Sequence, residues 1–145
     1  MTDKQDTFNA VATVFLMDCR SNFPSPVAFD QSEIIAKVQK LLPIDTVDTQ
    51  AVDPTVTWLA NEGFLKEEGI TRSEKMIDGV RNIHLLKNYS LTQKGLQATA
   101  SLPSPLLDSI EERRGGDHTN VEKHSFGFAG IAGEFVGGLF KSLTA

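Results

Sequence analysis

Three stretches in the first half of the chain carry hydrophobic residues every three or four positions, which is the spacing of one helix face. They predict helices over about residues 7–20, 31–42 and 54–62. The first presents a wide apolar face, whereas the third presents a narrower stripe that includes Val56 and Leu59. The pattern therefore predicts a small helical core at the start of the chain.

Polar residues that stop and start helices support these boundaries. Asp6 or Thr7 can cap the first helix and Asp30 the second. Asp53 precedes a proline, the arrangement of an N-cap followed by proline in the first turn. Gly63 stands where a left-handed residue ends the third helix.

The segment from residue 64 to residue 92 changes to an extended pattern. Asp78-Gly79 is the strongest two-residue turn signal in the chain and predicts one long β-hairpin, with a bulge at Gly69. A short helix within residues 72–79 is the competing local interpretation. Residues 27–29 are expected to add a short strand.

The chain then divides into a domain over residues 5–102, a polar linker over 103–124 and a terminal segment over 125–145. Thr92 is expected to cap a last helix of the domain, which prolines end after residue 102. Prolines, glycines and charged residues fill the linker, where at most one short helix is expected.

The terminal segment has the spacing of an amphipathic helix with many glycines. Its five glycines each cost about 1 kcal/mol relative to alanine, so this helix requires a surface to pack on. The surface could belong to the same domain or to the same helix of a second copy, and small residues would allow close approach. We expect a homo-oligomer. The residues expected to bind a partner in this helix are Phe128, Ile131, Gly133, Phe135, Gly137 and Leu139.

The composition of the chain predicts its cellular location and shows an uneven distribution of charge. The acidic start of the chain does not resemble a secretory signal, and the single cysteine, Cys19, cannot form an intramolecular disulfide, so we expect a cytoplasmic protein. A membrane span is not expected, because the apolar run is short and contains Glu134. Residues 1–63 contain four Lys/Arg and nine Asp/Glu, whereas residues 64–100 contain six and four. The hairpin is therefore the cationic part of the chain.

The order of these elements, with the runs Leu59-Ala60-Asn61-Glu62-Gly63-Phe64-Leu65 and Tyr89-Ser90-Leu91-Thr92-Gln93-Lys94-Gly95, resembles the winged helix-turn-helix of small bacterial MarR-type and PadR-type regulators. The resemblance covers about two thirds of the chain and leaves the terminal segment out. It implies an α+β fold, mainly α: a three-helix core with a β-hairpin wing, followed here by the Gly-rich amphipathic helix.

The resemblance also implies a DNA-binding transcription regulator, whose third helix enters a major groove. Thr55, Thr57 and Asn61 would contact bases, and the wing would contact phosphates through Arg72, Lys75, Arg81 and Lys87. The sequence departs from this pattern, since no Lys or Arg occurs between Lys40 and Lys66 while Asp45, Asp48, Asp53 and Glu62 lie there.

Protein recognition is the alternative function. Trp58 points away from the apolar stripe of its helix, and an acidic helix with an outward tryptophan suits a protein partner. The alternative for Trp58 itself is packing against the wing or the terminal segment. Membrane-surface or assembly binding through the terminal helix is a further alternative.

No catalytic pattern appears in the sequence. The three histidines, His84, His118 and His124, lack metal-ligand spacing, and Cys19 lies among apolar residues rather than in a cationic setting. We therefore expect a protein that is not an enzyme and that uses no metal or cofactor.

Overall fold

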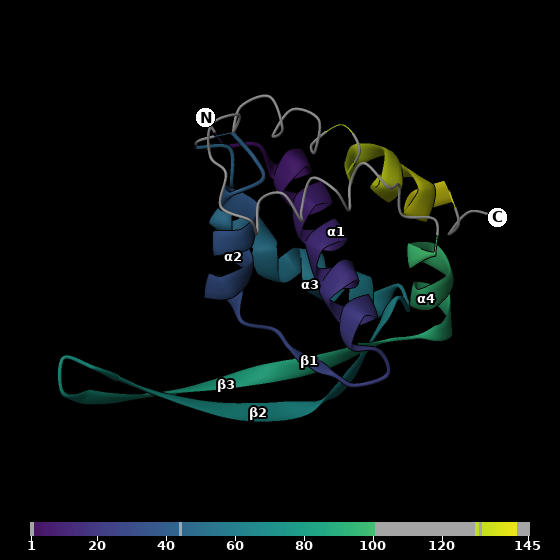
Figure 1. Cartoon of the computed structure of the whole chain (residues 1–145). Coiled ribbons are helices and arrows are strands. Elements are labelled where there is room, and N and C mark those ends of the chain that lie inside the picture. Colours follow the sequence, from purple (N-terminus) through teal and green to yellow (C-terminus); the bar gives the residue numbers. More distant parts are fainter. Residues whose placement is uncertain (1, 44, 101–129, 131, 142–145) are drawn as a thin grey trace.

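The computed structural model describes residues 2–43, 45–100, 130 and 132–141, and the described chain is α+β and mainly helical (Figure 1). Its elements are α1 (Lys4–Asn22), β1 (Val27–Ala28), α2 (Gln31–Gln39), the 3₁₀ turn η1 (Thr49–Ala51), α3 (Val52–Asn61), β2 (Leu65–Ile77), β3 (Val80–Leu91) and α4 (Gln93–Thr99). Residues 130 and 132–141 are helical as well, and we call them the C-terminal helix. The three strands form one antiparallel sheet in the order β1-β3-β2.

Helix α1 is longer than its predicted range of 7–20. It begins after Asp3, whose side chain accepts a hydrogen bond from the backbone N–H of Asp6 at 3.0 Å. The prediction that Asp6 or Thr7 caps the helix is therefore wrong. Thr7 is buried instead, and its hydroxyl accepts from the N–H of Asp48 at 2.9 Å, which fastens the loop before α3 to α1.

The predicted N-cap of α2 is confirmed, whereas the predicted N-cap of α3 is wrong. Asp30 caps α2, since its side chain accepts from the N–H of Ser32 at 3.0 Å. Asp53 does not cap α3, because the chain already turns through η1, and Asp48 caps that turn by accepting from Gln50 N–H. Gly63 has φ +86° after α3, which confirms the predicted left-handed end.

The hairpin is confirmed in detail. Ile77 pairs with Val80 around Asp78 (φ 52°) and Gly79 (φ 77°), the positive φ pair of a type I′ turn. The register shifts between Glu67 and Gly69, where the bulge was predicted. Residues 72–79 contain no helix. Figure 1 shows the two strands running below the helices and extending beyond them, so the outer end of the hairpin stands apart from the body.

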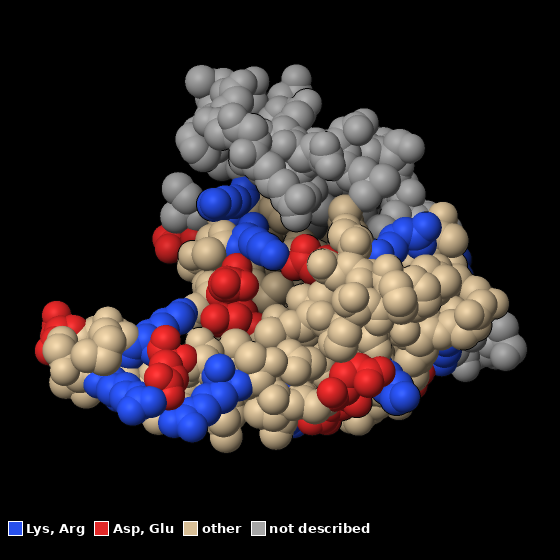
Figure 2. Space-filling model, turned by 60° about the horizontal axis from the view of Figure 1, so that its bottom comes forward, with Lys and Arg blue, Asp and Glu red and all other residues tan. Residues whose placement is uncertain are grey.

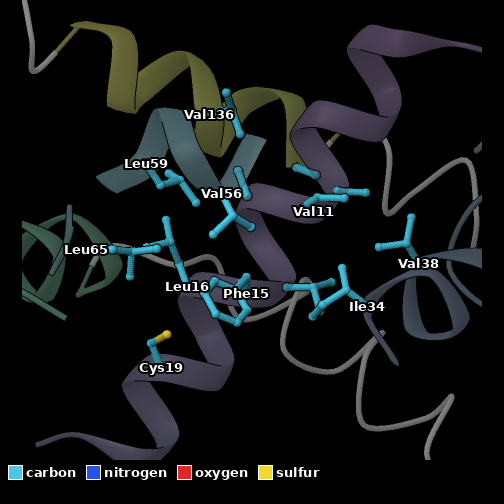
Figure 3. Packing of buried hydrophobic residues seen from close by; sticks show 14 of the residues in the cluster. Val11, Phe15, Leu16, Cys19, Ile34, Val38, Val56, Leu59, Leu65 and Val136 are labelled. Carbon is cyan, nitrogen blue, oxygen red and sulfur yellow. The ribbon is translucent and has the colours of Figure 1, made fainter. Parts of the chain in front are cut away.

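The hydrophobic core lies between α1, α2, α3 and the inner end of the sheet (Figure 3). Phe15 of α1 is fully buried, with ring centroids 5.4 Å from Phe29 and 5.9 Å from Tyr89 of β3. Figure 3 also shows Val136 pointing from the C-terminal helix towards Val56 of α3. The C-terminal helix therefore completes the core of its own chain.

Candidate functional site

The exposed face of α3 is the first surface expected to recognise a partner. Asp53, Thr57 and Asn61 are exposed and follow one another at intervals of one helical turn. Thr55 is only 1% exposed, and its hydroxyl donates to the carbonyl oxygen of Ala51 at 2.6 Å. The prediction that Thr55 faces outwards is wrong, because residue 55 lies on the same helix face as Val52 and Leu59, which are fully buried.

Trp58 does not point freely into solvent. It is half-buried, with its ring centroid 5.2 Å from Phe8 of α1, 6.0 Å from Phe64 and 5.1 Å from Phe140 of the C-terminal helix. The arrangement observed is the alternative in which Trp58 packs against the terminal segment. The prediction that Trp58 points outwards took only the stripe of Val56 and Leu59 as the buried face of α3. The C-terminal helix packs on a second face of α3, which carries Trp58.

The cations of the hairpin lie close to acids. Figure 2 shows Lys and Arg side chains over the hairpin with Asp and Glu among them. Arg72 and Arg81 both form ion pairs with Glu74, and the pair to Arg72 measures 3.2 Å. Lys75 lies 3.9 Å from Asp30 at the start of α2. Exposed pairs of this kind contribute little stability, but they lower the net charge that the hairpin offers to a phosphate backbone.

One face of the hairpin exposes four aliphatic side chains among four charged ones, a feature that the sequence pattern did not predict. Directly opposed residues share a face of an antiparallel pair, as do residues two apart in one strand. Ile70, Met76, Ile83 and Leu85 consequently share a face, and they are 62%, 70%, 47% and 69% exposed. We call this the aliphatic face; its members are Ile70, Arg72, Glu74 and Met76 of β2 and Arg81, Ile83, Leu85 and Lys87 of β3. The Asp78-Gly79 turn fixes the register of the hairpin, so counting every second residue of each strand from that turn would have assigned these residues to one face.

A cleft lies where the hairpin passes the start of α2. Its volume is about 400 Å³. Polar residues of α2 and its N-cap, α3, β2 and β3 line it, and they include both acidic and basic side chains: Asp30, Gln31, Ser32, Asp53, Ser73, Lys75, His84 and Lys87. Lys75 and Lys87, which were predicted to bind phosphates, therefore lie beside two carboxylates rather than on an open cationic surface.

The C-terminal helix holds several of the residues predicted to bind a partner. Phe135 and Leu139 are buried against the chain's own body, together with Ala132 and Val136. Gly133 lies near α1, where a Cβ would meet Asn9 Nδ2 at 3.5 Å. Phe128 and Ile131 lie outside the described residues, as does the predicted linker over 103–124.

The groups with potential chemistry are dispersed. Cys19 is buried, and burial, with a smaller contribution from the charge of Asp18, raises the pKa of its thiol to about 12. In the described part of the chain, no three His, Cys, Asp or Glu residues are placed to hold a metal ion. Over the same residues, no helix has the length and apolarity needed to cross a bilayer. His118 and His124 lie outside the described residues.

No family model, curated protein or solved structure matches the chain. The interpretation of these surfaces therefore rests on the residues and their geometry.

Proposed function

We propose that the chain is a non-catalytic winged-helix recognition module in which the hairpin is the wing and its aliphatic face binds a protein partner. The element order, the antiparallel sheet and the Tyr89 to Gly95 run support the winged-helix interpretation. The observation that carries the function is the presence of four exposed aliphatic side chains on one face of a projecting hairpin.

Physical considerations favour a partner for this face. A two-stranded hairpin is marginally stable in water unless something covers its apolar side. β1 pairs with β3 only through Val27 and Ala28, which lie opposite Tyr89 and Asn88. In the described chain, the part of β3 between the turn and residue 86 therefore has no strand beside it other than β2. Clustered exposed apolar side chains are typical of protein interaction sites. Each aliphatic residue of this face lies directly opposite a charged one, so Arg72 and Arg81, which share Glu74, would make polar contacts within the same interface.

DNA binding is the second candidate, as expected for a dimeric transcription regulator. Thr57 and Asn61 are exposed on one face of α3, and an asparagine amide can pair with adenine in a major groove. The acids weigh against this function. Asp53 shares the exposed face of α3, and Glu74 and Asp30 pair with three of the four wing cations. We therefore place protein recognition first.

Two double variants test the first proposal. Ile83→Asp with Leu85→Asp places two charges on the aliphatic face, whereas Asn82→Asp with His84→Asp places them on the opposite face of the same strand. Pull-downs from the source organism's extract should recover a partner with wild type and with the second variant, but not with the first. Recovery of the same proteins by both variants, or of none by wild type, would contradict the proposal.

Fluorescence anisotropy with labelled duplex DNA tests the second candidate. DNA binding through the wing should weaken as salt rises and should fall in Arg72→Ala with Arg81→Ala. Lys4→Ala with Lys40→Ala removes the same charge from the helical body and serves as the control. Absence of binding at low salt, or equal losses in both variants, rules out wing-mediated DNA recognition.

A further inference from the structure

The C-terminal helix covers an apolar surface that the body of the chain presents on α1 and α3. Phe140 stacks on Phe8 with centroids 6.1 Å apart and lies 5.1 Å from Trp58. Val136 is fully buried on the same side of the helix. We call the apolar side chains of α1 and α3 that this helix covers, among them Phe8 and Trp58, the Phe8–Trp58 surface. Removing the helix would expose two aromatic rings and the apolar residues beside them.

The glycines of the helix are not explained by this docked arrangement. Among the described residues, a Cβ on Gly130, Gly137 or Gly138 would meet no atom within 4 Å, and one on Gly133 would make an ordinary contact. None of these four positions has a positive φ that favours glycine. Alanine would therefore fit at all four, and each glycine costs the helix about 1 kcal/mol. The glycines therefore lower the intrinsic stability of the helix, although the packing at its docking site would accept alanine.

A weakened helix can leave its site, and the sequence gives it a long reach. Residues 101–129 separate α4 from the C-terminal helix, and a chain of that length spans at most roughly 100 Å. The helix can thus reach the Phe8–Trp58 surface of another molecule. The contacts made there would be the same ones, which is the condition for exchange of an identical element between two copies.

We propose that the Phe8–Trp58 surface is an exchangeable docking site that also accepts the C-terminal helix of a second copy in place of the chain's own helix. Within one molecule the tether gives the helix a high effective concentration, so the closed monomer dominates in dilute solution. Two copies held close together exchange helices and form a closed dimer. This interface is separate from the aliphatic face of the hairpin and does not depend on its function.

Trp58 is the only tryptophan in the chain, so its fluorescence reports directly on the docking site. Val136→Asp buries a charge under the helix and should release it, which shifts Trp58 emission to longer wavelength and increases quenching by acrylamide. Gly138→Asp adds the same charge at an exposed position of the helix and should leave both signals unchanged. Phe140→Ala removes the rim contact with Trp58 and provides a second releasing variant if Val136→Asp does not fold.

Exchange between copies is tested by mixing two full-length variants that are each expected to be monomeric. Val136→Asp has an intact docking site and a defective helix, whereas Trp58→Ala has a damaged site and an intact helix. The mixture should form a one-to-one dimer in sedimentation velocity, and a labelled peptide of residues 126–145 should bind Val136→Asp and restore its Trp58 emission. A mixture that stays monomeric together with a peptide that does not bind overturns the proposal. A control mixture combines Val136→Asp with Gly138→Asp, whose helix stays docked on its own chain. If this mixture forms as much dimer as the mixture of Val136→Asp with Trp58→Ala, the proposal is also overturned, because the dimer then does not require a released helix.

Discussion

Gly95 of α4 and the backbone carbonyl of Phe64 are packed so closely that a Cβ on residue 95 would lie 2.1 Å from the carbonyl oxygen. The same carbonyl accepts a hydrogen bond from the N–H of Thr92 at 3.2 Å, so it is held in place. The close approach joins the end of α3 to the start of α4. It also gives a physical reason for glycine at the last position of the Tyr89 to Gly95 run.

Gly95→Ala should therefore destabilise the protein by about 3 kcal/mol, although alanine is normally the better helix residue. The added methyl must displace backbone rather than a mobile side-chain end. Urea unfolding followed by circular dichroism measures the loss. Gln97→Ala, at an exposed position of the same helix, is the control and should change stability by less than about 0.5 kcal/mol. Equal stability of Gly95→Ala and wild type would contradict the close packing.

The sequence predicted local features well where one residue type has one conformational role. Asp78-Gly79 located the hairpin turn, Gly63 the end of α3 and Asp30 the start of α2, because each depends on neighbours within four residues. The helical spacing of the apolar residues Val56 and Leu59 likewise predicted the buried stripe of α3.

Features that depend on distant segments were predicted less well. Thr55 was placed outside although the face of α3 that it shares is buried. Trp58 has partners on α1 and on the C-terminal helix, and nothing in its own helix indicates them. The aliphatic face was not predicted for another reason: its exposure depends on how far the hairpin extends past the helices, which the local turn and strand signals do not specify.

The aliphatic face should be dispensable for folding. Leu85→Asp replaces a side chain that is exposed, so the free energy of unfolding should stay within about 0.5 kcal/mol of wild type. Leu91→Ala, at a buried position of the same strand, should cost about 3 kcal/mol. Thermal and urea unfolding of the two variants make the comparison. A large loss in Leu85→Asp would mean that this face packs on the protein's own body.

The stability of the protein should fall at alkaline pH because of Cys19. The folded-state pKa of its thiol is raised from 9.0 to about 12, mainly by burial and secondarily by the charge of Asp18. The unfolded chain therefore releases this proton at lower pH than the folded chain does. The stabilisation is complete below pH 9 and declines as pH rises from 9 towards 12.

Urea unfolding at pH 8 and at pH 10.5 should detect a loss from this group of about 2 kcal/mol. Cys19→Ala has a lower stability at both values because it leaves a cavity, but it lacks the thiol's contribution to the pH dependence. The difference between the two slopes isolates the contribution of Cys19 from those of Tyr89 and of the other ionisable groups. Parallel slopes for wild type and Cys19→Ala would show that the thiol ionises equally in both states.

The glycines of the C-terminal helix should be replaceable with a gain in stability. Gly137→Ala and Gly138→Ala place a methyl where nothing lies within 4 Å, so each should strengthen the docked helix by about 1 kcal/mol, a roughly fivefold decrease in its released fraction. Hydrogen exchange of amides 132–140 and acrylamide quenching of Trp58 should both decrease. Gly63→Ala provides the contrast, since its φ of +86° is strained for alanine and the variant should lose stability instead. Faster exchange in the Gly137→Ala and Gly138→Ala variants would mean that the docked helix itself requires these glycines. The glycines would then not be explained by release of the helix from the Phe8–Trp58 surface.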